Sequence, residues 1–124
     1  MFLNVSNHPS NMWQQKQLDA AREYGEIVDF GHPDIPACAT EDKIREIASK
    51  TVREIEELKP DVIFLAGEFT IAFMLVDELL SRGFTVLAAT SDRITEETEL
   101  DDGTMQKVSK FEFIQFRPYA RYRE

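Results

Sequence analysis

The sequence predicts an α/β domain whose strands and helices alternate and form a mostly parallel sheet. Residues 62–66 are a continuous apolar run of strand length, which is typical of a strand covered on both faces. Residues 41–58 carry apolar side chains at helical spacing, and a second apolar run follows at residues 85–89. Because helices separate the strands along the chain, we expect neighbouring strands to run parallel.

The first expected strand covers residues 2–5 and ends at the polar loop that starts with Ser6. Asn11 and Gln14 have the spacing of a capping box, in which two side chains satisfy free backbone N–H groups at the start of a helix. We therefore expect a first helix that begins at the Asn11 cap and ends at Gly25, with Trp13, Leu18, Ala21 and Tyr24 on its apolar face.

A second strand is expected at residues 26–30, and the prolines that follow it exclude a helix in the next segment. Thr40 can cap the helix at residues 41–58, because its hydroxyl can accept a hydrogen bond from the first turn. A third helix is expected between Ile71 and Gly83.

The last third of the chain predicts a long β-hairpin. Residues 94–100 and 105–116 flank a turn sequence that contains Gly103. Its apolar component comes from Phe111, Phe113 and Phe116. We expect these phenylalanines in the core or in a dimer contact, and the alternative is a platform on which bases stack.

Composition narrows the class of protein. The 124 residues are expected to form one domain, residues 1–124. The formal net charge of -9 argues against a protein that coats long nucleic acid, since such binding neutralises many phosphates. Basic side chains gather after residue 103, which permits a local anion site, and the alternative is that they are solvated charges flanking an edge strand. Cys38 is a lone cysteine, and neither a signal peptide nor an apolar run of roughly 20 residues occurs, so we expect a cytoplasmic protein.

Polar loops follow three of the expected strands, and in open parallel sheets ligands bind at these carboxyl ends. The residues expected to contact a ligand there are Ser6, Asn7, His8 and Ser10, then Gly67, Glu68, Phe69 and Thr70, then Thr90, Ser91 and Arg93. No loop has the glycine pattern of a nucleotide-binding motif, so no cofactor is expected.

Individual loop residues have alternative roles. His8 can act as a general acid or base because an imidazole titrates near neutral pH, or it caps the first helix. Arg93 can hold a phosphate in a bidentate fork, or it pairs with Glu96. Gly67 would let the backbone approach a ligand, and Thr70 would bond that ligand or cap the third helix.

No metal ligands are expected in this chain. Glu96 and Glu97 are neighbours in a hairpin strand, and neighbouring strand residues face opposite sides. His32 and Cys38 share a loop without a second pair of ligands.

Several of these motifs together resemble those of small stand-alone CRISPR-associated Rossmann-fold (CARF-like) proteins. They are the loop from Ser6 to Pro9, Gln17 with Ala21, the Gly-Glu-Phe-Thr sequence from Gly67, the Ala-Thr-Ser-Asp-Arg sequence that ends at Arg93, a glutamate-containing hairpin, and the Phe-x-Phe-x-x-Phe-Arg-x-Tyr sequence from Phe111. The resemblance runs along most of the chain.

The resemblance implies a Rossmann-like three-layer domain that forms a homodimer. It also implies binding of a cyclic oligoadenylate second messenger, with cyclic tetra-adenylate as the main expected ligand. Such proteins accompany type III CRISPR antiviral systems, and several are ring nucleases that cleave the ring without a metal ion. His8 would then assist proton transfer, and Gly67, Glu68 and Thr70 would shape the adenine and ribose pocket. The implied phosphate donors are Ser6, Asn7, Ser91 and Arg93.

Three other functions stay open. The same pocket could belong to a non-catalytic sensor or sponge, which only turnover separates from a nuclease. A Rossmann-like interaction domain would use the hairpin for a constitutive dimer and bind no nucleotide. A nucleoside-processing enzyme resembling deoxyribosyltransferases would use Glu68 as its nucleophile.

Overall fold

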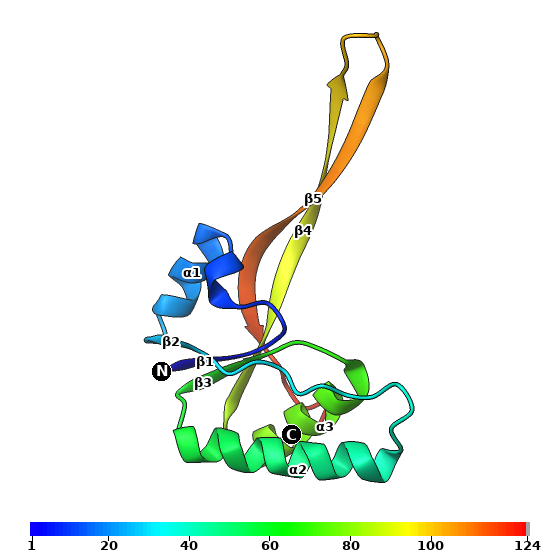
Figure 1. The fold of residues 1–124 in the computed structure, drawn as a ribbon. Coiled ribbons are helices and arrows are strands. Elements are labelled where there is room, and N and C mark those ends of the chain that lie inside the picture. Colours follow the sequence, from blue (N-terminus) through cyan, green and yellow to red (C-terminus); the bar gives the residue numbers. More distant parts are fainter. Residues whose placement is uncertain (124) are drawn as a thin grey trace.

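The computed structural model describes residues 1–123, and it confirms an α/β fold that ends in a β-hairpin (Figure 1). The elements, in chain order, are β1 (Phe2–Val5), the 3-10 helix η1 (Ser10–Met12), α1 (Gln15–Arg22), β2 (Ile27–Asp29), α2 (Glu41–Leu58), β3 (Val62–Leu65), α3 (Phe69–Ser81), β4 (Thr85–Glu99) and β5 (Met105–Pro118). None of the helices within residues 1–123 is long and apolar enough to cross a membrane.

The five strands form one mixed sheet with the order β2-β1-β3-β4-β5. The first four strands pair in parallel, as the alternation of strands and helices predicts, and β5 pairs antiparallel with β4. β3 lies in the middle of the sheet, and all four of its residues are buried. The mostly parallel sheet and the C-terminal hairpin are therefore both confirmed.

Helices cover both faces of the sheet. Because successive strand residues point to opposite sides, each strand contributes side chains to two separate cores. Leu3, Ile63 and Val86 belong to the core beneath α2 and α3. Phe2 and Phe64 belong to a second core, which also contains Ala21 of α1 and is largely aromatic. The sheet thus separates α1 from the other two α-helices.

The expected capping box at Asn11 and Gln14 is wrong. Residues 10–12 form the 3-10 helix instead, and α1 begins only at Gln15, with no side-chain hydrogen bond from Gln14 to its first turn. The Gln14 amide pairs with the free edge of β5: its Nε2 donates to the Phe111 carbonyl (2.8 Å), and its Oε1 accepts from the Phe113 N–H (3.0 Å). A tertiary contact has therefore replaced a local cap.

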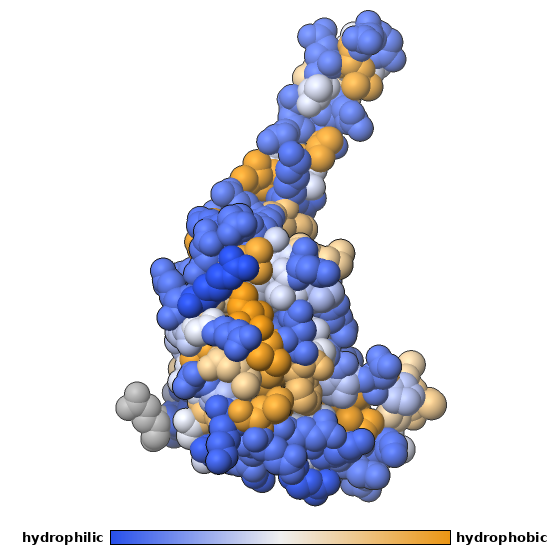
Figure 2. Space-filling view, turned by 60° about the vertical axis from the view of Figure 1, so that its left-hand side comes forward, coloured by the Kyte–Doolittle hydropathy of each residue, from blue (hydrophilic) through white to orange (hydrophobic). Residues whose placement is uncertain are grey.

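The expected loop from Thr90 to Arg93 is also wrong, because β4 runs unbroken through these residues. Beyond the sheet, β4 and β5 pair with each other alone as far as Glu99 and Met105, and this hairpin projects from the body (Figure 1). Figure 2 shows that its surface is mostly hydrophilic. β5 has one residue more than β4 at the base of the hairpin, which makes a bulge between Thr90 and Ser91 of β4.

The N-cap of α2 matches the expectation, since the Thr40 hydroxyl accepts a hydrogen bond from the Lys43 N–H (3.2 Å). Thr40→Ala should lower the free energy of unfolding by about 1 kcal/mol, because this N–H loses its partner. Urea denaturation measures the loss. Thr98→Ala, on the exposed hairpin, is the control, and an equal effect of both changes would contradict the assignment.

Candidate functional site

A crevice of about 430 Å³ lies where the carboxyl ends of β1 and β3 meet the base of the hairpin, beside the middle of β4. His8 and Trp13 line it from the segment after β1, and Ala66 follows β3. Ser91 and Phe111 line it from the two arms of the hairpin. The crevice therefore combines two residues predicted for a ligand site, His8 and Ser91, from two separate segments.

A buried amide fixes the loop that carries His8. Asn4, which is 1% exposed, donates from Nδ2 to the His8 carbonyl and to Asp29 Oδ1, both at 2.9 Å. Trp13 Nε1 donates to the same His8 carbonyl at 2.9 Å. The Ser6 hydroxyl donates to Asn4 Oδ1 at 2.6 Å. The backbone of His8 is thus held from two sides, while the residue itself is exposed at the crevice.

Two of the residues predicted to contact a ligand, Ser6 and Ser10, instead form hydrogen bonds within this network. Ser6 is 3% exposed, and its hydroxyl is bonded to Asn4. Ser10 bonds to Asp29 through its hydroxyl (3.0 Å) and its backbone N–H (3.1 Å). Both serines therefore position the loop, and Asn7 is the exposed polar neighbour of His8. Sequence reasoning missed Asn4, although a polar residue inside an apolar strand is a usable signal because it needs buried partners.

The three phenylalanines of β5 have different environments. Phe113 and Phe116 are buried in the aromatic core, as expected, with ring centroids 4.9 Å apart. Phe111 is 67% exposed and lines the crevice. Trp13 stands edge-on to Phe64, with ring centroids 5.7 Å apart, so its indole is held by the core below the crevice. An exposed ring and an anchored ring thus share one concave surface.

Arg93 lies on the same side of the hairpin as the crevice. It pairs across the strands with Phe111, and Ser91, two residues earlier, pairs with Phe113. The Arg93 Nη2 donates to the Ser109 hydroxyl at 3.2 Å. The alternative pairing of Arg93 with Glu96 does not form, since Glu96 contacts Lys110 (3.5 Å). Arg93 is therefore close to the crevice but directed along the hairpin.

Thr90, in contrast, does not line the crevice. Its hydroxyl donates to the Gln115 carbonyl of β5 at 3.1 Å. Because successive strand residues point to opposite faces, Thr90 lies on the far side of the sheet from Ser91. Its observed bond thus joins β4 to β5.

The third predicted segment, from Gly67 to Thr70, does not line the crevice either. Its residues lead into α3, which packs on the opposite face of the sheet from α1. α3 begins at Phe69, so the cap is Glu68 and not Thr70. The Glu68 carboxylate accepts from the Thr70 N–H (2.7 Å), the Ile71 N–H (3.2 Å) and the Thr70 hydroxyl (2.6 Å). The N-terminus of α3 is therefore already occupied by an anion of the chain itself.

Gly67 lets the backbone approach the His32 side chain, whereas the sequence predicted that it would approach a ligand. A Cβ at this position would lie 2.2 Å from Nε2 of His32, so the imidazole fills the space that a ligand was expected to use. His32 Nδ1 lies 3.1 Å from the Pro33 carbonyl. Nε2 is buried and has no hydrogen-bond partner within residues 1–123. The loop after β2 thus closes over the end of β3.

The part of the chain that the structure describes contains no group of three or more histidine, cysteine or acidic side chains able to hold a metal ion. Cys38 is exposed and unpaired in this range.

Gly67→Ala should destabilise the fold by about 1–3 kcal/mol, because the new methyl group and the His32 ring cannot occupy the same space. Adding His32→Ala should recover most of this loss. Chemical denaturation of both single variants and the double variant measures the coupling. Strictly additive effects would mean that the two side chains do not compete for this space.

Glu68 gives stability a defined pH dependence. Hydrogen bonds from the Thr70 hydroxyl and N–H hold the pKa of Glu68 below its ordinary value. Its contribution is therefore complete above about pH 4.3, the value in an unfolded chain, and is lost as the pH falls through the lower folded value. Glu68→Gln should flatten the acid limb of the stability curve, measured by thermal denaturation from pH 7 to pH 3. Parallel curves for the two proteins would refute the assignment.

Comparison with known proteins identifies a family. The sequence pattern of the family described as Uncharacterized protein MJ1673 family matches residues 1–117, which include every residue of the crevice. No curated protein and no solved structure matches the chain significantly. The chain thus belongs to the Uncharacterized protein MJ1673 family.

Proposed function

We propose that this protein is a CARF-like, Rossmann-like domain that binds a cyclic oligoadenylate, cyclic tetra-adenylate first of all, across a homodimer and opens the ring without a metal ion. The crevice carries the proposal, because Phe111 and Trp13 lie there beside His8 and Ser91. Stacking on an aromatic ring suits adenine, and imidazole and hydroxyl groups suit ribose and phosphate. Acting in the cytoplasm, the protein would switch off type III CRISPR signalling.

The size of the crevice supports a shared site. A volume of about 430 Å³ lies near the lower end of the range for small-molecule pockets, about 300–1,000 Å³, and suits one nucleotide rather than four. A ring of four adenylates is symmetric, so two copies of the crevice related by a two-fold axis would each take one part of it. The proposal therefore requires a homodimer.

Ring opening would proceed by attack of a ribose 2′-oxygen on the adjacent phosphorus. The P–O2′ bond forms while the P–O5′ bond breaks, so the 2′-hydroxyl loses a proton and the 5′-oxygen gains one. His8 would accept the first proton or supply the second. Ser91, Asn7 and Arg93 would donate to the phosphoryl oxygens, and Arg93 would leave Ser109 to do so. The product would be a linear oligoadenylate that ends in a cyclic phosphate.

The remaining expected contacts would act at a distance from the reacting atoms. Ser6, Ser10 and Thr90 would position the loop and strand through the hydrogen bonds described above. Gly67, Phe69 and Thr70 lie outside the crevice, so the proposal gives them no contact with the reacting part of the ring. Glu68 gives little support to a nucleoside-processing enzyme, because both of its carboxylate oxygens accept hydrogen bonds at the start of α3.

The test is incubation of the protein with cyclic tetra-adenylate and cyclic hexa-adenylate in the presence of a chelator. Chromatography detects linear products, and a parallel titration measures Kd. His8→Gln should abolish products while binding persists. Phe111→Ala should weaken binding about 5- to 150-fold, the effect of losing one base–aromatic stack.

Val108→Ala is the matched control, since Val108 is an exposed apolar residue on the opposite face of the hairpin from Phe111. It should leave both binding and turnover unchanged. Binding without products would replace the nuclease by a sensor or sponge. Neither binding nor products with the unaltered protein would sink the nucleotide proposal as a whole.

A further inference from the structure

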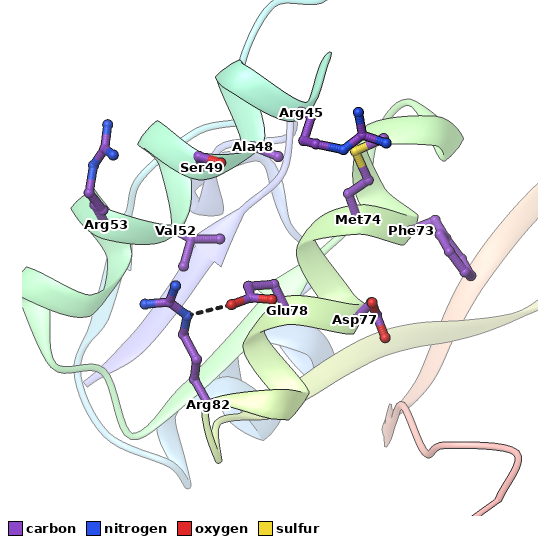
Figure 3. A pocket seen from close by; sticks show the side chains of 10 residues that line it. All are labelled: Arg45, Ala48, Ser49, Val52, Arg53, Phe73, Met74, Asp77, Glu78 and Arg82. Atoms are coloured by element: carbon purple, nitrogen blue, oxygen red, sulfur yellow. Dashed lines mark hydrogen bonds and ion pairs between the residues drawn. The ribbon is translucent and has the colours of Figure 1, made fainter. Parts of the chain in front are cut away.

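A basic groove lies on the outer side of α2 and α3, across the sheet from α1. It encloses about 640 Å³. Figure 3 shows Arg45 extending from α2 toward Met74 of α3 and Arg82, just after α3, extending toward α2, with Arg53 at the edge of the groove. A neighbouring hollow shares Phe73 with this groove and is lined by side chains of the C-terminal segment, Arg121 and Arg123 among them. Five of the eight arginines of an acidic chain thus gather on one surface.

The same surface exposes large apolar side chains. Phe69 and Phe73 lie one helical turn apart on α3 and are 89% and 75% exposed, and Tyr122 is 97% exposed. Only two acids, Asp77 and Glu78, line the groove and the hollow against the five arginines. Glu78 is engaged by Arg82 at 2.9 Å (Figure 3), and Asp77 by Arg121 at 3.3 Å. Two further acids outside the lining contact these arginines, since Arg45 pairs with Asp42 (2.9 Å) and Arg82 with Glu56 (2.7 Å). Five arginines thus face four acids, and the combined surface is apolar with a small net positive charge, which fits an acidic and partly apolar partner.

The tip of the hairpin has the complementary character. Residues 94–106 contain five acidic side chains and no basic one. Lys107 and Lys110 pair with two of these acids, Glu97 and Glu96, so the acidic charge of the tip rests on the other three, Glu99, Asp101 and Asp102. Leu100 and Met105 add exposed apolar surface there, at 42% and 57% exposure. A two-stranded hairpin is marginally stable by itself, so a partner surface would stabilise it. Figure 1 shows the tip and α2 with α3 at opposite ends of the molecule, so the hairpin does not reach the groove of its own chain.

We propose that the hairpin tip of one protomer docks in the groove between α2 and α3 of a second copy, which returns the same contact. Glu99 and Asp101 would face Arg45 and Arg53, and Leu100 would pack on Phe73. Because the exchange is reciprocal, each contact occurs twice and the assembly closes as a dimer.

This arrangement also places the two crevices. Ser91 lies six residues from the start of β4 at Thr85 and eight from its end at Glu99, or about 20 Å and 27 Å along the strand. In two antiparallel copies whose tips reach the opposite ends of each other, both crevices therefore lie at about the same level. This consequence rests on the proposed nucleotide site, whereas the docking itself does not.

The test is a charge-reversal exchange, followed by sedimentation velocity without nucleotide. Glu99→Lys with Asp101→Lys reverses the two tip charges that would face the groove, and Arg45→Glu with Arg53→Glu reverses the two groove charges that they would face. Each variant alone should dissociate, with a Kd at least about tenfold weaker than that of the unaltered dimer, because like charges then meet. A 1:1 mixture should form a heterodimer, since both of its contacts again join opposite charges.

The control is Glu23→Lys with Glu26→Lys, which changes the net charge as much as the tip variant does but lies near the end of α1. It should dimerise like the unaltered protein. A monomeric unaltered protein, variants that dimerise normally by themselves, or a mixture that stays monomeric would each overturn the docking. Because no nucleotide is present, none of these outcomes depends on cyclic oligoadenylate binding.

Discussion

The buried side chain of Asn4 is the constraint on which the ligand end of the fold depends. It lies within β1 between two fully buried apolar residues, where an unsatisfied amide would cost about 1–3 kcal/mol. Its hydrogen bonds are met by Asp29 at the end of β2, and by Ser6 and His8 after β1. One amide thereby ties two neighbouring strands to the loop at their carboxyl ends. The position of His8 follows from core packing as much as from its own sequence neighbours.

Most of the fold could be predicted from local patterns because burial acts on whole segments. The apolar run of β3 and the helical periodicity of α2 record which faces are covered, and both elements lie where expected. The prediction of a loop at residues 90–93 failed for the opposite reason. These residues are polar and their segment is solvated, and nothing local separates a solvated strand from a loop. Only the pairing with β5 makes this segment a strand, and that pairing is a long-range contact.

The candidate site was predictable only in part. The carboxyl ends of β1 and β3 do meet at one edge, beside the middle of β4, which is why His8 and Ser91 converge. The segment after β3 leads into a helix on the opposite face, so Glu68 and Thr70 lie apart from that crevice. The alternation of strands and helices predicts the edge of the sheet at which the strands end. It does not predict the face of the sheet on which each helix packs. The roles of Gln14 and His32 were missed for a related reason, since their partners are distant in the chain.

The extra residue of β5 at the bulge has a consequence for the direction of every side chain beyond it. Thr90 pairs with Gln115 and Ser91 with Phe113, so Ile114 has no partner across the strands. In a regular strand, Phe113 and Phe116, three positions apart, would point to opposite faces. The unpaired residue resets the alternation, and both rings enter the same core. It also fixes which side of the outer hairpin continues the crevice. If Ile114 were paired in a regular ladder instead, Phe113 and Phe111 would turn to the other side.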